Sequence, residues 1–572
     1  MRRSKIAIKA ALCLGIFMAS AMAQETTTAT ATATAAASVP TKFFDENGAY
    51  YGPDCDKDKN YSGAYYTGDY TSAFKKYLGK TDEEIQEKMD ALWNHYFKGD
   101  ENSKVFYDKG NEGYIKDINN NDVRSEGMSY GMMIAVQTGH KEEFDKLWKW
   151  AKNHMWHKGG DWDGYFAWQR NDSGTGGDDN CAPDGEMYFM MSLLFAANRW
   201  DDDQYRKDAH YIMDKMWNNP SHKLFNQGNY IIVFQPLGSG NDFSDPSYDL
   251  PAYLELFSRW AEKDTDKWKR AVTAARDHLY KSSHKTSGLF ADYSTFDGQP
   301  QSYSYNQNST KYMYDAMRSA MNFGMDFYLF GADSVREVEM AKRIIDFFEK
   351  DKYEHARFNW DGTGGSESYT QGEKGANAVA ALALRDVSGY DEIIKKNLQM
   401  AWDEPFMTGQ YRYYDGLVHY LAMLHLSGTF KIWKPKPKDV KEKTMEAAKI
   451  GDTEFKEGDI IDWFEDCQLY KVTFTAAAAP TPTPGDSTTT TPTPGDSTAT
   501  TPTPGDSTAV TTNPGDFTVV TPTPGDTTNA IRLMYMRDYG YKMQRDYNLK
   551  GCKVNSSNRA RGAYYGRMVP MK

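Results

Sequence analysis

Cysteine is scarce in this 572-residue chain, and long apolar runs are almost absent. Five Cys are present, and none of them has the spacing of zinc ligands. The eleven His form no cluster along the sequence, so we expect neither a metal nor another cofactor. The one apolar run, Ala10–Ala19, is too short to cross a bilayer. The pattern therefore excludes a zinc-finger class and a protein with a transmembrane segment.

The first 23 residues have the pattern of a signal peptide. A basic start precedes the apolar run, and Ala21–Ala23 has the small residues of a cleavage site. We therefore expect a secreted or cell-surface associated protein. Export permits disulfides, but four Cys allow three pairings and the sequence does not choose among them or exclude free thiols. The four that remain after cleavage are Cys55, Cys181, Cys467 and Cys552.

Composition divides the rest of the chain into five parts. The triplet Pro-Gly-Asp recurs every ten residues from 484 to 524, within Thr- and Pro-rich units that have no apolar positions to stack. Such units predict an extended spacer rather than a solenoid. The parts are a Thr/Ala-rich segment expected to be disordered (24–41), a globular body that we expect to be the catalytic domain (42–436), a charged extension of unassigned structure (437–475), the linker (476–528) and a C-terminal tail (529–572).

The tail is basic in an otherwise acidic protein. It has ten Lys and Arg against two Asp, about +8, whereas the whole chain carries −12. A basic module on a spacer favours an anionic cell-surface or fibre component as its partner. An exported protein rarely meets nucleic acid, so we expect no nucleic-acid partner. A solvated tail without any partner is the alternative.

Twelve segments of the body show the 3.6-residue apolar period of helices. Some, such as 125–137 and 184–199, are apolar on all sides, which is typical of buried helices; others, such as 140–155 and 334–351, are amphipathic and charged. This alternation predicts an all-α fold, an (α/α)6 barrel or toroid with six inner and six outer helices. The segments are 81–97, 125–137, 140–155, 184–199, 202–218, 248–263, 265–283, 311–330, 334–351, 374–386, 389–402 and 413–427.

Three acidic motifs lie at or near the starts of predicted helices that are rich in aromatic residues. They centre on Glu126, Asp184 and Asp315. Carboxylates on apolar helix faces are costly to bury and are usually kept for chemistry or capping. Aromatic residues make up 14% of the chain, and aromatic rings serve as platforms for sugar rings in glycan-binding clefts. A single cleft lined by carboxyl groups from several helices is typical of a glycoside hydrolase, which uses a pair of carboxyl groups to cleave the glycosidic bond.

Five ordered blocks carry a resemblance to glycoside hydrolase family 8 over nearly all of residues 80–435. The resemblance implies an (α/α)6 barrel and an inverting enzyme that cleaves β-1,4 glycans. The Ala182–Glu186 and Asp245–Tyr248 blocks resemble the xylan-active branch. The blocks are RSEGMSYGMM (124–133), GYFAW (164–168), APDGE (182–186), DPSY (245–248) and YDAMR (314–318).

The resemblance assigns roles to the three carboxyl groups. Glu126 matches the general acid, and a wall of Met and Tyr side chains would raise its pKa by desolvation. Asp315 matches the general base, which Arg318 three residues later can keep ionised. Asp184 matches the carboxylate that holds the sugar at the cleavage subsite. The structural alternatives are helix capping for Glu126 (with Ser125 as N-cap) and for Asp184, and an ordinary ion pair for Asp315.

The same blocks supply residues for sugar stacking or hydrogen bonding. For any aromatic residue taken alone, core packing is the commoner explanation. The substrate-binding residues that we predict are Tyr130, Trp168, Tyr248, Tyr314, Arg318, Tyr413 and Tyr414.

The sequence therefore predicts a secreted, monomeric β-1,4-xylan hydrolase acting on xylan or xylo-oligosaccharides. Endo cleavage is preferred, because the reducing-end exo branch carries a Leu-His pair before the tenth helix, and residues 369–376 lack it. The alternatives are a reducing-end xylose-releasing exo-oligoxylanase, a β-1,4-glucanase, and a glycan-binding surface protein without activity.

Overall fold

Twelve helices of ten residues or more dominate the regular structure of the chain that the structure describes. The computed structural model describes residues 42–55, 62–450 and 453–477. The expected signal peptide, the Thr/Ala-rich segment, nearly all of the repeat linker and the basic tail lie outside these residues. All twelve predicted helices are confirmed: α3 Asp82–Lys98, α4 Ser125–Thr138, α5 Lys141–His154, α6 Pro183–Trp200, α7 Asp203–Asn218, α8 Pro251–Trp260, α9 Thr265–Ser282, α10 Met317–Leu329, α11 Ser334–Asp351, α12 Gln371–Ala381, α13 Asp391–Asp403 and α14 Tyr414–Leu426.

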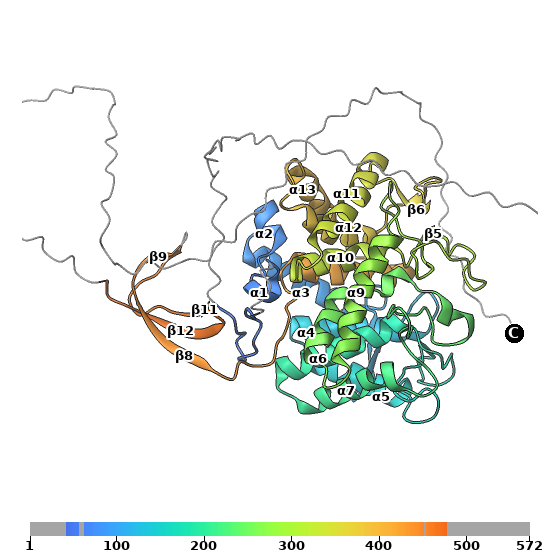
Figure 1. Cartoon of the computed structure of the whole chain (residues 1–572), viewed down its shortest axis with the longest axis horizontal. Coiled ribbons are helices and arrows are strands. Elements are labelled where there is room, and N and C mark those ends of the chain that lie inside the picture. Colours follow the sequence, from blue (N-terminus) through green and yellow to red (C-terminus); the bar gives the residue numbers. More distant parts are fainter. Residues whose placement is uncertain (1–41, 56–61, 451–452, 478–572) are drawn as a thin grey trace, which may run out of the picture.

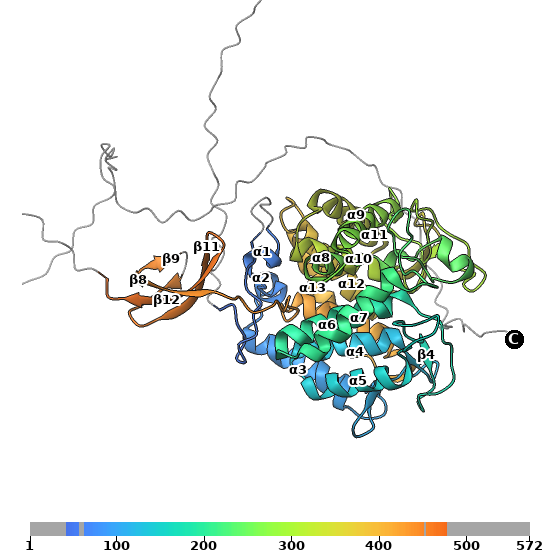
Figure 2. The same ribbon diagram turned by 60° about the horizontal axis from the view of Figure 1, so that its bottom comes forward.

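Six of these helices form a closed inner ring. Helix α4 contacts α6, α6 contacts α8, and the contacts continue in the same way through α10 and α12 to α14. Helix α14 packs against α4 and closes the ring. Each inner helix is backed by an outer one: α5, α7, α9, α11 and α13 follow α4 to α12, and α3 lies behind α14. This is the arrangement of the predicted (α/α)6 barrel, and it brings the starts of the inner helices together at one end (Figures 1 and 2).

Side-chain character explains which helices lie inside. In α6 every residue from Pro183 to Asn198 is buried, and in α4 only Glu126 and Thr138 are not. The outer helices α5 and α11 bury one stripe of apolar residues and expose charged ones, as expected for a surface layer. Among the described residues, we find no helix with the length and apolar content that a membrane span requires.

Short elements lie between the long helices. Two helices that the periodicity did not predict, α1 (Ala64–Thr67) and α2 (Ala73–Leu78), precede the ring. Small antiparallel strand pairs and 3-10 turns occupy the connections: β1 Phe106–Asp108, β2 Gly113–Ile115, β3 Val123–Arg124, β4 Gln169–Arg170, β5 Lys311–Tyr312, β6 His355–Asn359, β7 Ser366–Ser368, η1 Gly238–Asp242, η2 Pro246–Tyr248, η3 Leu382–Leu384 and η4 Gly409–Tyr411.

The charged extension, for which the sequence predicted no structure, forms a β-sheet unit within residues 440–475, so the described chain as a whole is not all-α. The sheet has the order β11–β12–β8, with β12 antiparallel to β11 and parallel to β8. It has its own small core, in which Ile461, Val472 and Phe474 pack with Ile450 and Phe455. Figures 1 and 2 show it beside α1 and α2, apart from the barrel. Its strands are β8 Val440–Glu446, β9 Lys449–Ile450, β10 Thr453–Glu454, β11 Ile460–Glu465 and β12 Gln468–Thr475.

The N-terminal segment joins this sheet unit to the barrel. A disulfide links Cys55 to Cys467, whereas the sequence left both disulfides and free thiols open. The backbone N–H of Phe43 donates to Asp462 over 2.7 Å, and Phe43 packs with Tyr50 and Leu469. Cys181 lies within the barrel as a buried free thiol.

Candidate active site

The N-terminal ends of three inner helices carry the acidic residues that the motifs singled out. Glu126 lies in the first turn of α4, and Asp184 lies in the first turn of α6. Asp315 lies in the turn just before α10, where its carbonyl accepts from the N–H of Arg318 over 3.1 Å. Because the inner helices start at the same end of the barrel, residues up to 190 positions apart meet there.

One guanidinium group links the three carboxylates. Arg318 Nη1 lies 3.0 Å from Glu126 Oε2 and 2.7 Å from Asp184 Oδ2. Its Nη2 lies 3.3 Å from Asp315 Oδ1. The predicted Asp315–Arg318 pair is therefore confirmed, but Arg318 is also the counter-ion of the other two carboxylates. Two further bonds fix the guanidinium, from Nη1 to Tyr130 Oη (2.7 Å) and from Nη2 to Ser247 Oγ (2.8 Å).

Burial gives Glu126 the properties of an acid near neutral pH. Desolvation raises its pKa to about 7; Arg318 opposes this rise, and the charges of Asp184 and Asp315 reinforce it. Oε1 of Glu126 accepts from the hydroxyl of Tyr413 over 2.9 Å. The side chain is still 16% exposed, so the carboxyl group is desolvated on most sides and open on one.

Asp315 is the most exposed of the three carboxylates, at 25% of its side chain. The hydroxyl of Tyr414 bridges this region, since it lies 2.9 Å from the carbonyl oxygen of Tyr314 and 3.5 Å from Asp315 Oδ1. The guanidinium of Arg318 separates Asp315 from Glu126, each of which contacts a different nitrogen. A carboxyl group with a raised pKa thus lies across the guanidinium from a more exposed, ion-paired carboxylate.

Two further carboxyl groups lie beside Asp315, and we did not predict a role for either. Asp245 is fully buried with Oδ2 lying 3.9 Å from Arg318, and burial together with the charge of Asp315 raises its pKa well above the usual range. The pKa of Asp292 is raised to about 8 for the same two reasons. Oδ1 of Asp292 accepts from the backbone N–H groups of Met313 and Ala316, each over 3.2 Å. Asp292 thereby holds the turn that carries Asp315.

Of these two carboxyl groups, only that of Asp245 lies in a sequence motif from which it could have been predicted. Asp245 begins the DPSY block, whereas Asp292 belongs to no block and comes to the site through a loop.

The remaining predicted residues divide between the cluster and its surroundings. The ring of Tyr248 lies 5.8 Å from the Arg318 guanidinium. Tyr130 and Tyr413 are almost completely buried and contact the charged groups through their hydroxyls. Trp168 and Tyr314 lie further out, where their rings contact Arg124 and Arg357 at 5.4 and 4.4 Å.

The capping alternatives are wrong in detail. The residue that precedes α4 is Arg124 rather than Ser125, and that before α6 is Ala182 rather than Asp184. Ser125 Oγ is buried without a hydrogen-bond partner among the described residues. Glu186 also lies in the first turn of α6, where it is buried, accepts from the N–H of Phe166 over 3.0 Å, and has its pKa raised to about 8 by burial.

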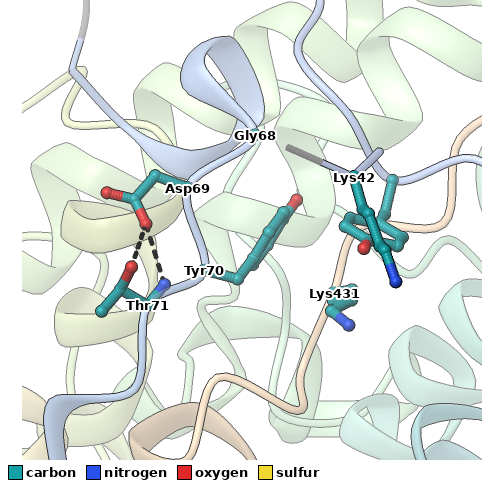
Figure 3. Close-up of a pocket in the computed structure, with 7 residues that line it drawn as sticks. Lys42, Gly68, Asp69, Tyr70, Thr71 and Lys431 are labelled. Carbon is teal, nitrogen blue, oxygen red and sulfur yellow. Dashed lines mark hydrogen bonds between the residues drawn. The ribbon is translucent and has the colours of Figure 1, made fainter. Parts of the chain in front are cut away.

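A separate cavity of about 200 Å³ lies away from these carboxylates (Figure 3). It is lined by residues from the N-terminal segment and the loop before α2, together with Lys431 from beyond α14. Asp69 is turned toward Thr71, whose N–H and hydroxyl donate to it over 2.9 and 2.6 Å. None of the residues that meet at Arg318 lines this cavity.

Comparison with known proteins gives consistent matches. Residues 105–428 match glycosyl hydrolases family 8. Over 390 residues the chain is 37% identical to a reducing end xylose-releasing exo-oligoxylanase of Halalkalibacterium halodurans, covering 66% of this chain and 98% of the relative. The structure of Rex8A from Paenibacillus barcinonensis complexed with xylose matches with a TM-score of 0.62 and 35% identity, covering 65% of this chain and 100% of the other. Endoglucanase A of Acetivibrio thermocellus is 24% identical over 366 residues, covering 62% of this chain and 72% of the relative.

Proposed function

Because the chain belongs to glycoside hydrolase family 8, we propose that it hydrolyses β-1,4-xylosidic bonds with inversion and releases xylose from the reducing ends of xylo-oligosaccharides. The observation that carries this proposal is the meeting of Glu126, Asp184 and Asp315 at Arg318. A glycan-binding protein without activity would not need three carboxylates kept at the starts of three helices, so the complete set disfavours that alternative.

Each carboxyl group has a distinct role in the proposed reaction. Glu126, with its pKa near 7, protonates the glycosidic oxygen as the leaving sugar departs. Asp315, paired with Arg318, takes a proton from the water that attacks the anomeric carbon from the opposite face. Inverting enzymes separate the two carboxyl groups by roughly 6.5–9.5 Å to leave room for this water. Asp184 holds the sugar between them, and Arg318 fixes the relative positions of all three.

The relatives favour the exo mode over the endo cleavage that we preferred from the sequence. Three of them, at 35–37% identity, are named as reducing-end xylose-releasing exo-oligoxylanases. The preference for endo cleavage depended on residues 369–376 as a loop. In the structure Thr370 instead forms a capping box with Glu373, so that α12 begins at Gln371. Most of the segment on which the preference depended is therefore helix and not loop, so it is weak evidence for an open cleft.

Identity also favours xylan over glucan as the substrate. The endoglucanases among the relatives reach 24–29% identity, against 35–37% for the exo-oligoxylanases. Product analysis on xylohexaose and cellohexaose tests both points together. We expect xylose and xylopentaose as the first products from xylohexaose, and little product from cellohexaose. Xylobiose with xylotetraose as first products would show endo cleavage, and faster release from cellohexaose would overturn the proposed substrate.

We also propose that the protein acts outside the cell and that its basic tail attaches it to an anionic surface. The signal-peptide pattern supports export, and disulfides such as Cys55–Cys467 are typical of exported proteins. Deleting residues 478–572 should leave hydrolysis of soluble substrates unchanged and weaken retention on cells or fibre. Equal retention of both forms would argue against attachment through the tail.

A further inference from the structure

A row of aromatic rings leads away from the site at Arg318. It begins at Tyr248, whose ring is nearly parallel to that of Phe234 at 6.2 Å. Phe234 is 5.6 Å from Tyr303, and Tyr303 stacks on Tyr305 at 5.7 Å. The row therefore connects the 3-10 turn that contacts Arg318 with the loop that follows Asp292.

Exposure increases along this row. Tyr248 is 7% exposed, Phe234 and Tyr303 are half-buried, and Tyr305 is 67% exposed. Tyr305 has the largest exposed fraction among the exposed large aromatic side chains of the described chain. A single exposed apolar residue needs no explanation. Tyr305, however, ends a row of ring contacts that starts beside the buried carboxylates, stacked at its two ends and edge-on between Phe234 and Tyr303, and it presents a flat apolar face to solvent.

The loop that carries the two outer rings is held in place. Asn306 donates to Asp292 Oδ2 over 3.2 Å, and Asp292 also holds the turn of Asp315. Ser309 is buried; its hydroxyl accepts from the N–H of Tyr303 (3.1 Å) and donates to the carbonyl of Gln301 (2.8 Å). The position of Tyr303 and Tyr305 is thus fixed relative to the base-bearing turn, although Tyr305 itself reaches into solvent.

We propose that Tyr303 and Tyr305 form an outer subsite that stacks on a sugar ring of a bound chain, beyond the sugars that contact the three carboxylates. This inference rests on the proposed function for the identity of the sugar. A xylopyranosyl ring offers two flat C–H faces, which match an exposed tyrosine ring that is already stacked on a second one. The continuity of the row with Tyr248 argues for a unit of the substrate chain itself as the occupant.

The test compares kinetics on a series from xylobiose to xylohexaose. In Tyr305→Ala the ratio of variant to wild-type KM should increase with chain length and reach about three- to tenfold for xylohexaose, while kcat stays near wild type, because stacking contributes roughly 0.5–1.5 kcal/mol. Tyr305→Phe should restore most of the wild-type KM, because the ring and not the hydroxyl carries the contact.

Tyr211→Ala is the matched control, since Tyr211 is 41% exposed on the outer helix α7 and its loss should change no KM value. A KM ratio that is independent of chain length, or equal KM values for Tyr305→Ala and wild type on xylohexaose, would overturn the subsite. If the wild type prefers cello-oligosaccharides, the same series is run with them. The proposed substrate then fails, whereas a length-dependent effect still supports the subsite.

Discussion

An arginine surrounded by carboxyl groups lies at each end of helix α10, but the two clusters differ in access to solvent. At the N-terminal end Arg318 contacts Glu126, Asp184 and Asp315, two of which are partly exposed. Near the C-terminal end Asp326 is fully buried and makes two bonds of 2.8 and 2.9 Å with Arg276.

We call the second cluster closed because its carboxylates are nearly inaccessible: Asp326 is 0% and Glu255 is 9% exposed, whereas Arg276 itself is 12% exposed. Arg276 also contacts Glu255 at 3.1 Å. Glu337 beside it is buried, with its pKa raised well above the usual range by burial and by Asp326.

The comparison shows that burial of carboxylates does not by itself identify an active site. Both clusters break the rule that charges stay at the surface, and both perturb the pKa of a nearby glutamate. Each cluster has three carboxyl groups around one arginine, but only the Arg318 cluster has an opening for a substrate and helix N-termini pointing at it. The Arg276 cluster has a bidentate pair whose role is to hold α9 against α10.

Replacing Glu126, the proposed general acid in the Arg318 cluster, should have the largest effect on kcat. We expect Glu126→Gln to lower kcat on xylohexaose by roughly 10³- to 10⁴-fold, because the leaving sugar then departs without a proton. Calorimetry should show substrate binding close to wild type. Glu337→Gln is the matched control at the closed end and should remain active. Turnover of Glu126→Gln near wild type would remove Glu126 from the mechanism.

The base at the same end gives the next largest effect. Asp315→Asn should lower kcat by roughly 10²- to 10³-fold, because the attacking water loses its proton acceptor. Added azide needs no base and should restore part of the turnover, with a glycosyl azide detectable by mass spectrometry. Proton NMR of the wild-type reaction should show inverted first product; a retained anomeric configuration would contradict both carboxylate assignments.

Breaking the closed cluster should affect stability and not chemistry. Asp326→Asn leaves a buried guanidinium with a weaker partner, so we expect the free energy of unfolding to fall by about 3–5 kcal/mol in urea titration. The kcat of the folded fraction should remain within about twofold of wild type. A stable variant with much lower kcat would mean that the two ends of α10 are coupled.

The pH dependence of kcat/KM should also distinguish the two clusters, through the smallest of the expected effects. Because the role proposed for Glu126 requires its protonated form and its pKa is about 7, kcat/KM should fall about tenfold per pH unit above that value. Glu126→Gln should lose this limb, whereas Glu337→Gln should retain it. A wild-type profile that stays flat from pH 6 to 9 would argue against Glu126 as the group that limits activity.

The barrel and its principal carboxylates could be predicted from the sequence, since long apolar periods define helices and motifs mark the starts of α4, α6 and α10. The sheet unit could not. The exposed strand β8 reads VKEKTME, without a continuous apolar face, and its small core depends on pairings with β11 and β12. Asp292 reaches the site through a loop fold that no local pattern specifies. Arg318 looked like a partner of Asp315 alone, because its contacts with Glu126 and Asp184 cross between helices.

The Cys55–Cys467 bond closes the backbone into a ring of covalent bonds that contains the whole barrel. A protease that cuts one peptide bond in any surface loop between these two positions would open the ring without releasing a fragment. The nicked molecule would migrate as one species under non-reducing conditions and separate only after a reductant is added. The two pieces of a nicked barrel would therefore stay tethered close enough to re-associate.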